Sequence, residues 1–119
     1  MPVSTVTVTT DSAGAATKLV AIHGTILCIQ YDKTDYDNGV DFTITTETTL
    51  QTVWDEDDVN ADKTVCPRQA THSTAGVAAT YDGTRAVLDY VYADFENLKI
   101  VIGSGGNAKS GVFRIFTSG

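Results

Sequence analysis

Alternation of polar and apolar side chains, with a period of two residues, is the feature that most restricts how this chain can fold. Threonine alternates with valine in residues 4–9, and in residues 41–46 Phe42 and Ile44 fall on one face with polar side chains on the other. This period is typical of a β-strand that buries one face. About one residue in six is threonine, a β-branched type that suits a pleated sheet. The sequence therefore predicts an all-β protein.

Other segments with strand character are separated by turn residues at short intervals. They are residues 18–22, 25–31, 50–54, 63–66, 86–92, 97–102 and 111–117, and for residues 86–92 an irregular crossover is the alternative to a strand. No segment keeps an apolar stripe of helical period. The pattern predicts a single domain over residues 1–119, either a β-sandwich or a jelly-roll-like barrel of roughly seven or eight short strands.

Three details of this pattern give expectations about topology. Residues 25–31 are apolar on both faces for most of their length, which indicates a central strand. Residues 103–107 are predicted to be a hairpin turn that pairs the last two strands. The acidic run 55–58 is predicted to be a solvated loop, and residues 68–84, rich in alanine, threonine, glycine and serine, a long surface loop of the kind that forms interfaces.

Charge and composition exclude several partners. The formal net charge is −7, and the eight lysines and arginines are scattered along the chain, so no nucleic-acid partner is expected. No apolar run is long enough to span a bilayer, and the acidic chain would be repelled by anionic membranes. Residues 1–5 lack the pattern of a signal peptide, so we expect synthesis in the cytoplasm, with Cys28 and Cys66 as reduced thiols.

Motifs for phosphate and metal binding fail on their spacing. Residues 103–110 come close to a phosphate-binding loop, but Ala108 stands where the second glycine is needed and a strand follows instead of a helix. In residues 35–39 the glycine comes at the fifth position, whereas a calcium loop needs it at the sixth. The adjacent carboxylates of residues 55–58 are more typical of a solvated surface. We therefore predict no metal and no cofactor.

Nothing in the sequence assembles a catalytic site. His23 and His72 have no ligand or carboxylate neighbours at metal spacing, and Cys28 between two apolar residues is expected in the core. Cys66 with His72 lacks an orienting acid and an oxyanion hole. Trp54 is expected to pack in the core, with sugar stacking as the alternative. The prediction is that the protein is not an enzyme.

The order of several short motifs resembles a widespread group of small virion-associated proteins encoded by tailed bacteriophages and prophages. The motifs occupy residues 5–12, 24–27, 31–34, 39–45, 51–54, 67–72, 98–102 and 105–111. The resemblance implies a structural protein of the particle, of the capsid cement or decoration type. It implies no catalytic residue.

From these expectations, the protein is made in the host cytoplasm and is then located on the capsid surface of the virion. The expected partners are the major capsid protein and the chain itself, as a homodimer or homotrimer. The expected interface residues are Arg68, Gln69, Thr71 and His72 in the long loop and Val6 and Val8 in the first strand. The alternatives are a neck, tail or head-fibre component, and a carbohydrate-binding β-sandwich that uses Trp54 and nearby tyrosines.

Overall fold

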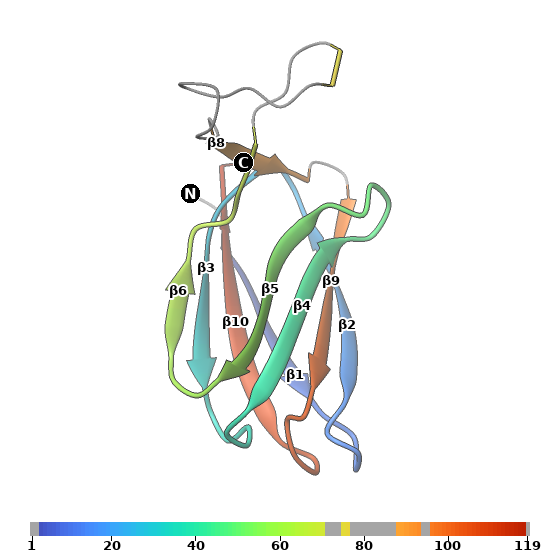
Figure 1. Cartoon of the computed structure of the whole chain (residues 1–119), viewed down its shortest axis with the longest axis vertical. Helices are drawn as coiled ribbons and strands as arrows, with labels where there is room; N and C mark the ends of the chain where they lie inside the picture. The colour runs from blue at the N-terminus through green and yellow to red at the C-terminus, as the bar shows by residue number, and fades with distance from the viewer. Residues whose placement is uncertain (1–2, 71–74, 77–87, 94–95, 119) are drawn as a thin grey trace.

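The computed structural model describes residues 3–70, 75–76, 88–93 and 96–118, and in these residues the fold is an all-β sandwich of two antiparallel sheets (Figure 1). The larger sheet contains β1 (Val3–Thr9), β3 (Thr25–Lys33), β6 (Lys63–Val65), β7 (Arg68–Ala70), β8 (Leu88–Tyr92) and β10 (Ser110–Thr117). The smaller sheet contains β2 (Ala16–Ile22), β4 (Val40–Thr46), β5 (Thr52–Val59) and β9 (Glu96–Gly103). The predicted all-β sandwich is confirmed.

Strand order shows which elements lie at the sheet edges. The larger sheet runs β1-β10-β3-β8-β7, with β6 also paired to β3, and the smaller runs β2-β9-β4-β5. The central position predicted for residues 25–31 is confirmed, because β3 has neighbours on both sides. The described residues hold ten strands, more than the seven or eight expected. One of the additional strands, β7, lies inside the segment that was predicted to be a loop.

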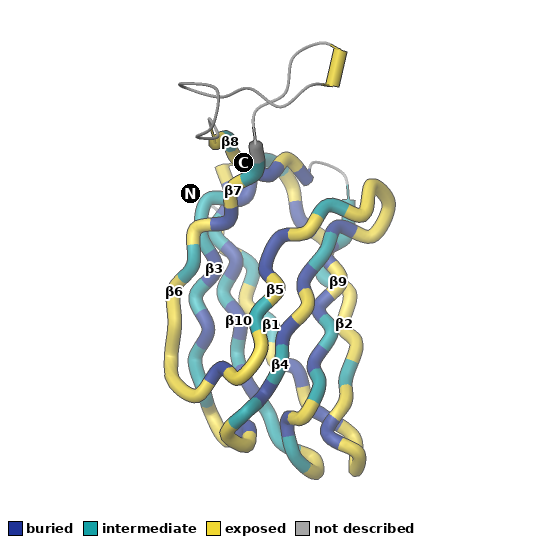
Figure 2. The backbone as a smooth tube through the Cα atoms, in the orientation of Figure 1, coloured by how far each residue is buried: buried dark blue, intermediate teal, exposed yellow. Residues whose placement is uncertain are grey.

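The core lies between the sheets and is filled by the inward residues of the alternating pattern. Along β4, β9 and β10 buried and less buried residues alternate, which Figure 2 shows as alternating colours along the tube. Phe42 is at the centre, with its ring centroid 4.7 Å from that of Tyr31 and 5.1 Å from those of Trp54 and Phe113. Edge-on contacts of this kind add to the free energy gained from burial.

Trp54 is only 6% exposed and belongs to this core, as the sequence predicted. Its indole Nε1 donates a hydrogen bond of 3.1 Å to Glu56 Oε1. The Trp54 ring therefore presents no open face on which a sugar can stack.

The predicted acidic loop is wrong, because residues 55–58 continue β5. An edge strand tolerates charge where a central strand does not, since its outer face and free backbone groups meet water. A bulge relaxes the ladder here, and Asp58 takes a φ of 59° while its N–H donates to Asp41 Oδ1 at 3.0 Å. Charges on an edge strand discourage pairing with another sheet, which gives this run a structural role.

The predicted hairpin of the last two strands is also wrong. β9 pairs with β2 and β4 in the smaller sheet, whereas β10 pairs with β1 and β3 in the larger one. The glycine-rich connection therefore crosses from one sheet to the other. The prediction that a strand follows this connection is confirmed by β10.

Three connections meet at one end of the sandwich, which we call the loop end. They are residues 10–15, 34–39 and 104–109. Backbone groups join them directly: Gly105 N donates to Gly14 O at 2.9 Å, and Asp37 N donates to Gly105 O at 3.0 Å. Thr10 Oγ1 donates to Gly106 O at 2.6 Å. Each connection thus forms hydrogen bonds with the backbone of another, and these bonds hold the three connections together at the loop end.

Candidate interaction surface

The opposite end of the sandwich, which we call the β8 end, exposes apolar side chains. On β8, Leu88 is 60% exposed, Tyr90 40% and Tyr92 52%, while Val91 between the two tyrosines is fully buried. The strand keeps its period of two, so these three side chains point away from the core. We call them, with Arg68, the β8 face. Large exposed apolar side chains grouped on one strand are the usual mark of a binding surface.

Arg68 completes the β8 face from the neighbouring strand. It is the partner of Tyr90 in the β7–β8 pairing, and its guanidinium carbon lies 4.4 Å from the centre of the Tyr90 ring. The same guanidinium donates to the backbone oxygens of Leu27 and Pro67, at 3.2 and 2.7 Å. These contacts hold a cation over an aromatic ring at the surface. Arginine and tyrosine are the residue types enriched where protein interfaces gain most of their affinity.

Polar contacts hold the β8 backbone in place. Gln69 Nε2 donates to Tyr90 O and Gln51 Nε2 donates to Tyr92 O, both at 3.0 Å. The Tyr92 hydroxyl donates to Asp89 Oδ1 at 3.0 Å, and this bond to the carboxylate raises the pKa of Tyr92. The ring of Tyr92 is thus oriented while its apolar surface stays in solvent.

The interface residues predicted from the sequence are only partly brought together. Arg68 and Gln69 lie side by side on β7, next to the exposed residues of β8, although in a strand and not in the predicted loop. Thr71 and His72 lie outside the described residues, as does most of the remainder of the predicted loop 68–84. The structure adds Leu88, Tyr90 and Tyr92, which the sequence interpretation had placed in a strand without assigning an outward face.

Val6 and Val8 face the interior. Val8 is 2% exposed, and Val6 is half-buried and packed against the core. β1 nevertheless ends the order of the larger sheet, paired with β10 on one side only in the described residues. What this strand offers is therefore its backbone edge, to which an extended segment can add.

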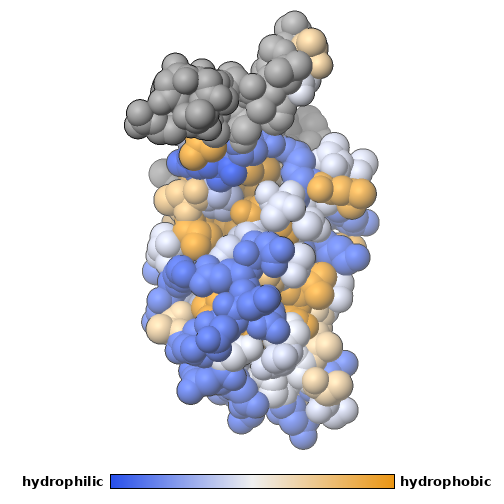
Figure 3. All heavy atoms as spheres, viewed as in Figure 1, coloured by the Kyte–Doolittle hydropathy of each residue, from blue (hydrophilic) through white to orange (hydrophobic). Residues whose placement is uncertain are grey.

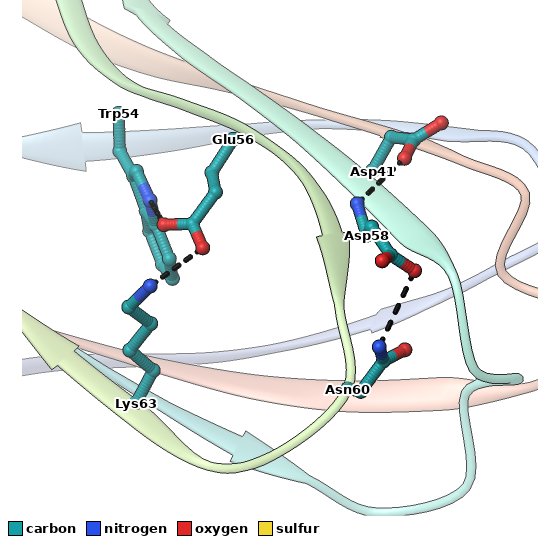
Figure 4. Close-up of polar contacts among 6 residues, drawn as sticks. All are labelled: Asp41, Trp54, Glu56, Asp58, Asn60 and Lys63. Atoms are coloured by element: carbon teal, nitrogen blue, oxygen red, sulfur yellow. Dashed lines mark hydrogen bonds and ion pairs between the residues drawn. The ribbon is translucent and has the colours of Figure 1, made fainter.

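A second, polar surface covers β5 and the turn into β6, where hydrophilic side chains gather on the face shown in Figure 3. A shallow hollow of about 220 Å³ lies here, lined by Glu56 and residues 58–63. Glu56 Oε2 pairs with Lys63 Nζ at 2.5 Å, and Asn60 Nδ2 donates to Asp58 Oδ1 at 3.3 Å (Figure 4). Lys63, and then the Trp54 indole, lower the pKa of the Glu56 carboxyl.

These carboxylates are engaged within the protein and do not converge. Within the described part of the chain, no three His, Cys, Asp or Glu side chains are grouped so that they could hold a metal ion. The described residues also contain no helix with the length and apolarity required to cross a membrane.

The two cysteines lie together, although the sequence interpretation treated them separately. Cys28 is half-buried and not fully in the core, Cys66 is exposed, and their Sγ atoms are 2.7 Å apart. His72, which the sequence analysis considered together with Cys66 as a possible catalytic pair, lies outside the described residues.

No protein-family model, no curated protein and no solved structure matches this chain. The resemblance to small virion proteins therefore remains a prediction.

Proposed function

We propose that the chain is a structural protein of a tailed-phage particle, a cement or decoration protein that binds the outer surface of the capsid shell and stabilises contacts between capsomers. The observation that carries the proposal is the β8 face, where Leu88, Tyr90 and Tyr92 are exposed beside an oriented Arg68. A rigid sandwich with one apolar, aromatic end is suited to docking, which needs a preformed surface and no reaction chemistry.

The remaining surface supports the same role. A chain with a net charge of −7 repels its own copies, which favours solubility before assembly. The acidic residues of β5 discourage pairing at that edge, whereas β1 carries only hydroxyl and apolar side chains along its free edge. In the proposed role the β8 face contacts the major capsid protein. The β1 edge accepts an extended segment of the capsid protein or of a second copy, in a homodimer or homotrimer.

The test is co-sedimentation with capsids of the phage or prophage whose genome encodes the chain, after removal of any endogenous copies. We expect the purified protein to saturate the capsids at a stoichiometry close to that of the major capsid protein. The double variant Leu88→Ser/Tyr90→Ser should bind at least about 100-fold more weakly, since it removes two anchors of the interface.

The matched control is Leu19→Ser, which replaces a leucine of similar exposure (48%) on β2 and should bind like the wild type. Failure of the wild type to bind capsids would contradict the proposal. Equal loss with the control would show that the β8 face is not the contact. Saturation at a few copies per particle would instead support a neck, tail or head-fibre component.

A further inference from the structure

Strand register places the two cysteines opposite each other. In the antiparallel pairing of β3 with β6, Ile29 faces Val65 and Gln30 faces Thr64. One more step in the same register puts Cys28 opposite Cys66. Residues that face each other in an antiparallel pair have Cα atoms about 4.5–5.5 Å apart, which lies within the span of a disulfide. Extended one residue past the end of β6, the register is therefore compatible with a cross-strand bond between the two cysteines.

The side chains are compatible with the same bond. The sulfurs are 2.7 Å apart in the reduced form that the structure describes, with one thiol donating to the other. Cys66 is exposed and accessible to an oxidant, whereas Cys28 is half-buried behind it. The hydrogen bond with Cys66, and then burial, raise the pKa of the Cys28 thiol.

Within the described residues, no metal site accounts for the pair. A structural zinc site needs four ligands, and the described residues offer no third His, Cys, Asp or Glu beside the two sulfurs.

We propose that Cys28 and Cys66 form an intramolecular disulfide when the protein meets a low-molecular-weight disulfide such as oxidised glutathione. The Cys66 thiolate attacks one sulfur of oxidised glutathione, which forms a mixed disulfide and releases one glutathione thiol. The Cys28 thiolate then attacks Cys66 Sγ and releases the second. Two protein thiols are oxidised, one disulfide is reduced to two thiols, and both protons are accounted for.

The bond would fasten the segment that carries the β8 face. Cys66 is followed by Pro67 and then by β7, whose Arg68 lies over Tyr90. The two cysteines are 38 positions apart, so the bond closes a long loop that includes β4 and β5. Closing a loop of this length restricts the unfolded chain and stabilises the native one. The pair is reduced in a cytosol and oxidised outside a cell.

The test incubates the full-length protein with oxidised glutathione and reads free thiols, intact mass and the melting temperature. We expect both thiols to become unreactive, the mass to fall by about 2 Da, and a peptide map to show Cys28 linked to Cys66. The melting temperature should rise by about 10 °C, and dithiothreitol should reverse the rise.

Cys66→Ser is the first control, because the residue is exposed and its replacement should not disturb folding. In this variant the oxidant should leave the melting temperature unchanged, and Cys28→Ser should behave in the same way. Disulfide-linked dimers on a non-reducing gel would overturn the proposal. Glutathione retained on Cys66 without closure, or an oxidised protein whose melting temperature equals that of the reduced one, would also overturn it.

Discussion

The two ends of the sandwich are held by different means. At the loop end, connections from both sheets bond to one another through backbone groups, and a buried tyrosine seals the contact: Tyr36 is 2% exposed and donates to Val8 O at 2.6 Å. At the β8 end, polar side chains such as Gln51, Gln69 and Arg68 donate to backbone oxygens, in addition to backbone bonds such as that from Ala93 N to Gly24 O. Apolar side chains there remain in solvent.

The difference shows how a small sandwich can separate stability from recognition. Close backbone contact at the loop end excludes larger side chains, so substitutions there should be costly. Side-chain support at the β8 end leaves the outward positions free to vary without loss of the fold.

Gly111→Ala, at the start of β10 where it meets Tyr36 of the loop end, should be a highly damaging single change. An added Cβ would lie 2.3 Å from Cε2 of the buried Tyr36 and 3.0 Å from Cε1 of Tyr31, and neither ring has room to move. We expect the free energy of unfolding to fall by about 3 kcal/mol. Urea denaturation measures this. Gly103→Ala is the control, because its added Cβ meets nothing within 4 Å, and equal losses in both variants would contradict the packing argument.

Alkaline pH should destabilise the protein through the buried tyrosines. Burial raises the pKa of Tyr31 from 10 to about 12, and also raises that of Tyr36. Above pH 10 the unfolded chain loses these protons while the native state retains them. Stability is therefore intact below pH 10 and is lost as the pH rises towards 12.

The loss due to Tyr31 should approach about 2–3 kcal/mol at pH 12. Urea titrations at several pH values measure it, and Tyr31→Phe should make the decline shallower. A free energy of unfolding that stays constant from pH 9 to 12 would contradict the assignment.

Removing the hydroxyl of Tyr36 and removing that of Tyr31 should have different effects on the free energy of unfolding. Tyr36→Phe removes the bond to Val8 O and should cost about 1–2 kcal/mol. The Tyr31 hydroxyl is buried without a hydrogen-bond partner among the described residues, so Tyr31→Phe should be neutral or stabilise by about 1 kcal/mol. Thermal melts at pH 7 measure both. If Tyr31→Phe costs as much as Tyr36→Phe, the two hydroxyls do not differ as described.

Substitutions on the β8 face should have the smallest effect on stability. Leu88 is exposed, and Leu88→Ser should change the free energy of unfolding by less than about 0.5 kcal/mol. The comparison is Leu98→Ser in β9, a fully buried position where several kcal/mol are expected. A large loss with Leu88→Ser would mean that this side chain supports the fold and is not reserved for a partner.

Local alternation predicted most of the strands and the core but not their pairing. The period of two in residues 41–46 places Phe42 and Ile44 inside, as observed. The glycine-rich residues 103–107 indicate a turn, but they do not indicate with which strand the following segment pairs. Whether β10 pairs with β9 or crosses to the other sheet depends on contacts between distant segments, such as Gly105 with Gly14.

The candidate surface was less predictable for the same reason. Arg68 and Gln69 stand out as polar residues beside a proline, but their neighbours on β8 lie about twenty positions further along the chain. Alternation in 88–92 distinguishes two faces without showing which one meets the other sheet. The approach of Cys28 to Cys66 likewise follows from the register of β3 with β6, which neither segment specifies alone.

Native-state hydrogen exchange, resolved by residue, tests the contrast between the two ends most directly. We expect strong protection at the loop end, where the amides of Asp37 and Gly105 donate to backbone oxygens, comparable to that of the core strands. We expect weaker protection at the β8 end, for example at Ala93, whose amide bond to Gly24 O is 3.3 Å. Rapid exchange at Asp37 and Gly105 together with strong protection at Ala93 would contradict the proposed difference between the two ends.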